Sequence, residues 1–297
     1  MLKKTSVFLC LCLLYQTMSS SPVLAWGLDV HRFITDRAIQ ILPQPLRSFF
    51  QKHRAFVVEH SVDPDLWRSA GFVEEPSRHF LDLDAFGEYP FSELPRDRES
   101  ARERFGSEMI EKEGQVPWRT VEINQRLVDA FEQLKPEGNR YAAEDVKFFS
   151  AILSHYVSDA HVPFHTVKNY DGQLTGQTGI HSRFETELFL RYQREIVVSP
   201  PRLYPVERPL DLMFGILLKS FTLVDPILNA DLKSIEGLES YDEIYFQRLF
   251  RSTRSILESQ VSDSISTVAS MIVGAWEKAG RPDLPLEAKV VNRKIRP

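Results

Sequence analysis

The eight histidines are the residues of this chain whose chemistry is most informative. All of them lie between His31 and His181, and Asp or Glu residues accompany several of them at short spacing. Imidazole nitrogen and carboxylate oxygen are the ligands that proteins use together for zinc and similar ions. The pattern therefore indicates a metal site built from the first two thirds of the chain.

The strongest cluster is segment 155–165, which contains His155, Asp159 and His165. At about 100° per helical residue, His155 and Asp159 line up with apolar Phe148 and Ile152 and point into the core. Burying an unpaired ionisable group is costly, so each needs a partner or a metal. From this segment alone, two interpretations stay open: a His–Asp ion pair that locks two helices together, or a metal site.

Two further clusters pair a histidine with a carboxylate. His181 and Glu185 are four residues apart, which puts them on the same helical face. A surface contact between them is the alternative to a shared metal. His79 is preceded by Asp65, and neither residue is informative alone.

A fourth cluster depends on processing of the N-terminus. Residues 1–25 carry two lysines, an apolar stretch at 7–14 and a Val-Leu-Ala ending at 23–25, so we expect a cleaved export signal and a periplasmic or extracellular protein. Cleavage would expose the α-amino group of Trp26, five residues before His31. A free amine there could itself bind a metal.

The composition limits the classes of protein that fit. Of 297 residues, 43% are hydrophobic and 26% charged, which is typical of a globular chain and not of a disordered or polytopic membrane protein. The net charge of -5 becomes -7 without the two signal lysines, so no global basic field attracts nucleic acid. Both cysteines, Cys10 and Cys12, lie in the predicted signal. The mature chain would therefore have no disulfide.

Helical periodicity predicts the elements that must position these residues. The longest predicted helices are 30–42, 118–134, 141–160 and 241–279. We also expect Asp29 to cap the first of them, one buried helix over 213–228, and a polar face on the third formed by Lys147, Ser150, Ser154 and Ser158. The predicted fold is all-α, with a single mainly helical domain over 26–280 and a C-terminal tail at 281–297. We expect no transmembrane span after processing and infer no protein partner.

Together, in this order, the four clusters resemble the zinc-dependent phospholipase C and single-strand-specific nuclease superfamily of secreted, mainly helical phosphoesterases. The resemblance spans 26–185. It implies three zinc ions: one held by Asp65, His79, His155 and Asp159; one by His165, His181 and Glu185; and one by the Trp26 backbone, His31 and a bridging Asp159. It also makes Asp65 the candidate to orient or deprotonate the attacking water.

The chemistry suits these residue types apart from the resemblance. Asp65, Asp159 and Glu185 offset only half the charge of three divalent ions, so a positive cluster remains to bind a phosphodiester. Zinc also lowers the pKa of water and so supplies a nucleophile near neutral pH.

The residues divide almost evenly between the two branches of the superfamily, phospholipase C and nuclease. Glu185 as the last ligand and the lack of cysteines favour a phospholipase C with a phospholipid substrate. The step from Trp26 to His31 favours a nuclease acting on single-stranded nucleic acid. Phe80 beside His79 has two interpretations, a residue that stacks on a base, which also favours a nuclease, or a residue that packs in the core. We therefore predict a phosphodiester hydrolase of phospholipase C type, ahead of a nuclease by a narrow margin. A non-catalytic exported protein with structural zinc is the alternative from another class.

Overall fold

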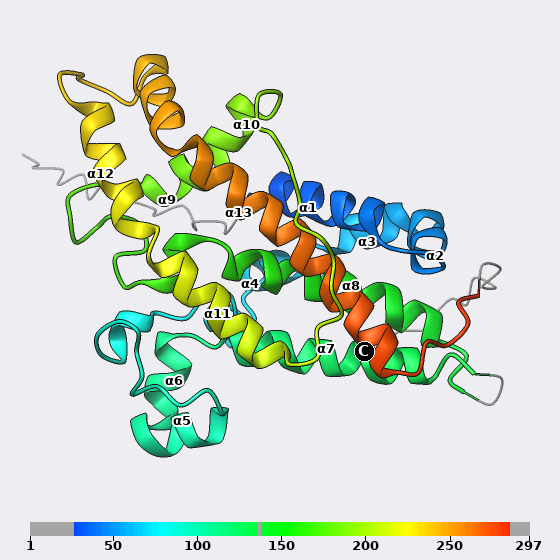
Figure 1. The fold of residues 1–297 in the computed structure, drawn as a ribbon. Coiled ribbons are helices and arrows are strands. Elements are labelled where there is room, and N and C mark those ends of the chain that lie inside the picture. Colours follow the sequence, from blue (N-terminus) through cyan, green and yellow to red (C-terminus); the bar gives the residue numbers. More distant parts are fainter. Residues whose placement is uncertain (1–26, 136–137, 286–297) are drawn as a thin grey trace, which may run out of the picture.

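The computed structural model describes residues 27–135 and 138–285, and over these residues the chain is helical without any β-strand. The nearest approach to a sheet is one isolated bridge between Leu81 and Gly114. The all-α prediction is confirmed. Figure 1 shows α13 running diagonally across α8 and α7, and α13 packs against both.

The first half of the described chain consists of short helices followed by one long one. The elements are α1 (Leu28–Ile41), α2 (Leu46–Lys52), α3 (Arg54–His60), α4 (Asp63–Ser69), η1 (Pro76–Arg78), η2 (Leu83–Ala85), α5 (Arg98–Phe105), α6 (Ser107–Glu113) and α7 (Val116–Glu132). The second half contains α8 (Ala142–Ala160), η3 (Pro163–Thr166), α9 (Ile180–Ser182), η4 (Arg183–Glu187, a π-helix), α10 (Leu188–Tyr192), α11 (Pro209–Phe221), α12 (Val224–Ile235) and α13 (Glu243–Lys278).

Helix α8 forms the centre of the molecule. It packs against α7, α13, α3, α1 and α11, and all but four of its nineteen residues are buried. Glu144 in its first turn complements the positive end of the helix dipole, and Pro163 prevents it from continuing into η3. Side chains on α8 can therefore be held away from solvent on every side.

The predicted polar face of α8 exists, but it faces neighbouring helices instead of solvent. Ser154 Oγ lies 2.7 Å from Thr35 Oγ1 of α1, and Ser264 Oγ of α13 donates to Ser158 Oγ at 3.3 Å. Serines are small and hydrogen-bond across close helix contacts, so most of the polar stripe fits inside the core, although Ser150 Oγ has no hydrogen-bond partner within the described residues.

The other long predictions agree with the structure to within two residues at each end, apart from one error. The helix predicted over 213–228 is two helices, α11 and α12. Pro226 explains the break, since its ring would clash with the carbonyl of Thr222 in a continuous helix. No helix in the described ranges is long and apolar enough to span a membrane.

The ends of the chain lie mostly outside the described residues. Asp29 stands within the first turn of α1 and does not cap it, because the N-cap position is Gly27. Residues 281–285 are the described part of the predicted tail. There Pro282 accepts a hydrogen bond from Trp276 Nε1 at 3.0 Å, and Leu284 packs against the core.

Candidate metal centre

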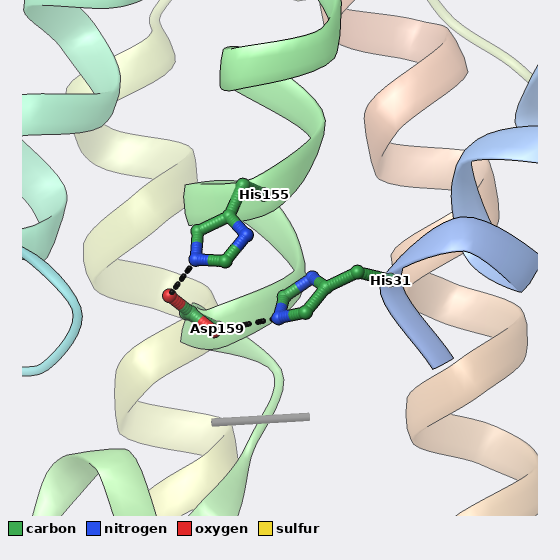
Figure 2. A group of neighbouring side chains, drawn as sticks. All are labelled: His31, His155 and Asp159. Carbon is green, nitrogen blue, oxygen red and sulfur yellow. Dashed lines mark ion pairs between the residues drawn. The ribbon is translucent and has the colours of Figure 1, made fainter. Parts of the chain in front are cut away.

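The centre begins with two side chains one turn apart on α8. His155 and Asp159 are both fully buried, and His155 Nε2 lies 3.3 Å from Asp159 Oδ2. Figure 2 shows both side chains turned toward His31 of α1. The expectation that this face of α8 carries its ionisable groups into the core is met.

The Asp159 carboxylate lies among four histidines from different elements. Its Oδ2 is 3.0 Å from His79 Nδ1, while its Oδ1 is 3.4 Å from His31 Nε2 and 3.8 Å from His165 Nδ1. The two oxygens therefore face different partners. This placement suits a carboxylate that serves more than one metal ion.

One group that could hold a metal consists of Asp65, His79 and His155, whose ligand atoms lie within 4.8 Å of one another. Asp65 comes from α4, and its Oδ1 also pairs with Arg68 Nη2 at 3.0 Å. His79 follows η1. Three segments far apart in the sequence thus converge here.

A second group is formed by His165, His181 and Glu185. His181 Nε2 is 3.0 Å from Glu185 Oε2, so the four-residue spacing does place them together. Both are buried, and the alternative of a surface contact is wrong. The segment is more irregular than the sequence pattern predicts, because Glu185 stands in the π-helical turn η4.

The third group is His31 with His155 and Asp159. Trp26 lies outside the described residues. Its neighbour Gly27 donates its backbone N–H to Thr186 Oγ1 at 3.1 Å, and a Cβ on Gly27 would lie 2.7 Å from Thr186 Cγ2. The chain therefore enters the fold beside the turn that carries Glu185.

Backbone carbonyls orient two of the imidazole rings. His155 Nδ1 donates to the Ser61 carbonyl at 2.9 Å, and His165 Nδ1 donates to the His79 carbonyl at 2.8 Å. With the proton held on Nδ1, the Nε2 lone pair of each neutral ring is free to bind a metal.

The backbone around His79 is fixed by close contact with Gly114. The Leu81 N–H donates to the His165 carbonyl at 2.9 Å, and the Val116 N–H donates to the Phe80 carbonyl at 3.1 Å. Gly114 has a φ of 109°, and a Cβ there would lie 2.2 Å from the Phe80 carbonyl oxygen. Only glycine fits this crossing.

Burial and neighbouring charges set the protonation states in the buried cluster. Burial lowers the pKa of His165 well below its usual value, and it lowers the pKa of His31 with help from nearby His155. Burial alone would raise the pKa of Asp159, but His155, His31 and His79 outweigh it and hold that pKa well below the ordinary value. Burial therefore favours neutral imidazoles at His31 and His165 beside an ionised Asp159, whereas at His155 the charge of Asp159 outweighs burial and raises the pKa.

Buried polar atoms that lack a partner show whether zinc would fit among these side chains. Within the described residues, the buried atoms of this cluster that have neither a hydrogen bond nor an ion-pair contact include His31 Nδ1, His181 Nδ1, Asp65 Oδ2 and Glu185 Oε1. Such atoms are rare in native cores because leaving them unpaired is costly. Nitrogen and oxygen donors of these types fit zinc.

A cavity of about 260 Å³ opens onto the centre; its lining includes His79, His165 and His181. Phe80, the predicted substrate-binding residue, also lines it. Sequence reasoning missed five more lining residues, Arg68, Pro76, Asp82, Phe164 and Tyr170. Three of them stand close in sequence to a predicted ligand: Arg68 near Asp65, Asp82 near His79 and Phe164 next to His165.

Three histidines left out of the prediction lie outside all three groups. His161 Nε2 lies 3.2 Å from Thr267 Oγ1, and His60 Nδ1 lies 2.7 Å from Asp63 Oδ2. His53 packs its ring against Phe49. The structure thus brings together eight of the nine predicted ligands and none of the other histidines. Their assignment as zinc ligands stays a prediction.

Fold and centre together define an all-helical protein with a buried histidine and carboxylate cluster able to hold several metal ions. The model of the zinc dependent phospholipase C family matches residues 30–218, more than half of the chain, so the chain belongs to this family. A comparison with curated proteins gives no match. The predicted kinship is confirmed at the level of the family.

Proposed function

We propose that this chain is an exported phosphodiester hydrolase of phospholipase C type that uses three zinc ions. The observation that carries the proposal is the Asp159 carboxylate, whose two oxygens face different histidines. One ion pair that locks two helices would need neither four histidines nor the second group around Glu185. A shared, bridging carboxylate accounts for the whole arrangement.

The three groups divide the ligands among the proposed ions. The first ion would be held by Asp65, His79, His155 and Asp159; the second by His165, His181 and Glu185; and the third by His31, Asp159 and the backbone of Trp26 at a cleaved N-terminus. Since the second ion has three protein ligands, a position stays open for water or substrate, which is typical of catalytic zinc.

The residues around the cavity have distinct parts in the reaction. Bound zinc would supply positive charge for a phosphodiester and lower the pKa of water. Asp65 Oδ2 has no hydrogen-bond partner within the described residues and would accept the proton of the attacking water. Arg68 pairs with Asp65, and its side chain also lines the cavity, where its guanidinium would hold a phosphate oxygen.

The cavity lining favours a lipid substrate over nucleic acid. Phe80, Phe164 and Tyr170 give the cavity apolar walls next to the histidines. The net charge of the mature chain provides no general attraction for a polyanion. Phe80 would then pack against the substrate without stacking on a base.

Export is part of the proposal, because the third site needs a free α-amine at Trp26. Gly27 beside Thr186 supports this, since the described part of the chain begins next to the segment that contributes Glu185. An uncleaved chain would have an amide nitrogen at Trp26, which is a poor metal ligand. The protein would therefore be latent before the signal is removed.

The test is an assay of purified mature protein whose zinc content has been measured. Substrates are phosphatidylcholine vesicles, single-stranded DNA, RNA and a simple aryl phosphodiester, with Asp159→Ala as the inactive control. We expect about three zinc ions per chain and release of diacylglycerol. Cleavage of nucleic acid alone would make the protein a nuclease. Full zinc with no hydrolysis would leave the metals structural.

A further inference from the structure

A second and larger cavity lies beside the metal centre and has no part in the chemistry described so far. Its volume is about 510 Å³, within the range of small-molecule sites. Pro76 and Phe80 line both this cavity and the one over the histidines. The two cavities are therefore neighbours that share one wall, formed by the start of η1 and the residue after His79.

Cationic side chains dominate the lining of this second cavity, which we call the arginine pocket. They come from four helices: Arg78 of η1, Arg98 and Arg102 of α5, Lys112 of α6 and Arg119 of α7. Three carboxylates accompany them, those of Glu74, Glu111 and Glu122. A lining with more cations than anions, assembled from separate elements, suits an anionic ligand.

Most of these cations are already paired. Arg78 reaches Glu74 and Glu75, at 2.7 and 2.9 Å. The remaining pairs are Arg102 with Glu99 and Glu111, Lys112 with Glu113, and Arg119 with Glu122. The charge available for a ligand must therefore come from a cation that has no carboxylate of its own.

Arg98 is that cation. Among the described residues, no carboxylate lies within ion-pair distance of it, and its Nη2 donates to the amide oxygen of Gln115. Burial and the charge of nearby Arg102 lower the pKa of Arg98. Desolvation and repulsion by Arg102 thus make the positive charge of Arg98 less favourable, and an anion bound in the pocket would offset both costs.

Free donors point to the chemistry of the ligand. The Nε atoms of Arg98, Arg102 and Arg119 are all buried, with no hydrogen-bond partner in the described ranges. Guanidinium presents Nε and Nη donors as a planar fork that matches the oxygens of phosphate. Three arginines that line one cavity and each keep an unfilled donor suit a phosphate, which has enough oxygens to accept from all of them.

We propose that the arginine pocket binds a second phosphate, carried on the headgroup of the phospholipid whose phosphodiester is cleaved at the metal centre. This rests on the proposed function. The wall shared through Phe80 and Pro76 would let one headgroup reach both cavities. The chain would then prefer lipids with a phosphorylated headgroup over those with choline.

The lining argues against two other ligands. A quaternary ammonium needs an aromatic cage, whereas Phe80 is the sole aromatic residue that lines the pocket. The excess of cationic side chains would also repel a quaternary ammonium. Single-stranded nucleic acid needs several stacking platforms along a groove. A compact, polar and cationic cavity instead fits a small phosphorylated headgroup.

The experiment compares Arg98→Gln with wild type as the full mature, zinc-loaded chain. Arg104→Gln is the matched control, because Arg104 is on the same helix but pairs with Glu93 and does not line the pocket. Substrates are phosphatidylcholine vesicles and the same vesicles with a minor fraction of phosphatidylinositol phosphate. We expect kcat/KM for the phosphorylated lipid to fall about tenfold in Arg98→Gln only, with phosphatidylcholine unaffected.

A binding arm separates this inference from the proposed function. Inositol bisphosphate is titrated calorimetrically into wild type and both variants, with inorganic phosphate as the comparison ligand. We expect Arg98→Gln to weaken binding of inositol bisphosphate about tenfold, and Arg104→Gln to leave it unchanged. If this result holds while wild type cleaves no phospholipid, the pocket stands and the proposed function fails.

Other results would overturn the inference. Equal losses on both lipids would make Arg98 a structural residue. An effect of Arg98→Gln on cleavage of single-stranded DNA alone would make the pocket a nucleic-acid site. Inorganic phosphate that binds as tightly as inositol bisphosphate, with the same dependence on Arg98, would show a site for free phosphate instead of a headgroup.

Discussion

Two buried polar clusters lie on either side of η4, and their hydrogen bonding differs. One is the metal centre, with Asp65, Asp159 and Glu185 fully buried among histidines. The other, which we call the Arg183 network, joins Arg183 of η4 to Asp231 of α12 and Tyr245 of α13. Both place charges in the core, yet only the network satisfies its charged groups with the protein's own atoms.

The Arg183 network is nearly saturated. The guanidinium donates to Tyr245 Oη at 2.9 Å, to Asp231 Oδ1 at 3.1 Å, and to the carbonyls of Thr178 and Gln177. Asp231 Oδ2 accepts from Gln177 Nε2 at 2.6 Å. A buried pair with every charged donor and acceptor used is typical of a structural lock.

The contrast gives a physical criterion for a site. Burial and charge alone do not separate the two clusters, since each has them. What differs is that the metal centre leaves carboxylate oxygens and ring nitrogens unfilled, so its polar groups match a cation that the protein itself does not supply.

The largest effect should come from Asp159→Ala. Loss of the shared carboxylate should remove more than one zinc ion and reduce turnover at least about a thousandfold, because metal catalysis depends on the intact cluster. Glu185→Ala, which serves one ion, should lose less zinc and less activity. Metal analysis and turnover measure both. Full zinc and full activity in Asp159→Ala would refute the bridge.

Asp231→Asn should show the opposite profile. Removing one charge from the buried pair should lower the free energy of unfolding by about 3 kcal/mol, because Arg183 loses its counter-ion. Zinc content at saturating zinc should stay at the wild-type value. Denaturant unfolding and metal analysis are the measurements. If zinc were lost without any change in stability, the distinction between lock and site would fail.

Gly114→Ala should weaken the metal centre through its backbone support. The added Cβ would meet the Phe80 carbonyl and displace His79, at a cost of about 2 kcal/mol in stability and with reduced zinc affinity. Gly106→Ala is the control, since Gly106 also has a positive φ but no atom within 4 Å of its Cβ position. If both substitutions lowered stability and zinc affinity equally, the positive φ of glycine, and not the clash with Phe80, would explain the loss at Gly114.

The smallest expected effect follows from lengthening the mature chain by one residue. Protein starting at Ala25 should bind about one zinc fewer than protein starting at Trp26 and turn over about tenfold more slowly, because its terminal amine is displaced from His31. Its unfolding should change little, since the Arg183 network is untouched. The same zinc content and turnover in both proteins would leave His31 as a core histidine.

The long helices could be predicted from sequence because each carries several turns of one periodicity. The four predicted helices begin and end within two residues of α1, α7, α8 and α13. The prediction failed at 213–228, where an apolar run hid the break before Pro226. It also left α5 and α6 unassigned, since helices this short lack enough turns for a pattern.

The site could be predicted in part. Residue type and spacing, together with a resemblance, identified the histidines and carboxylates that converge. Nothing in the sequence showed that Arg98 and Arg119 face one cavity, or that Gly114 crosses the Phe80 backbone. Those are contacts between segments without a local pattern, and they arise only when the helices pack.

The π-helical turn η4 has a consequence for how the chain tolerates insertions and deletions. A π-helix holds one residue more per turn than an α-helix would over the same span. Deleting one residue of this turn, such as Thr186, would return it to α-helical geometry and leave the flanking residues facing as before, because the π-turn absorbs the extra residue. Leu188 and Phe189, both fully buried, would then stay in the core. The same deletion inside a regular α-helix would instead rotate every later residue by about 100°. An alignment gap at this turn therefore removes a residue without changing which side chains are inside.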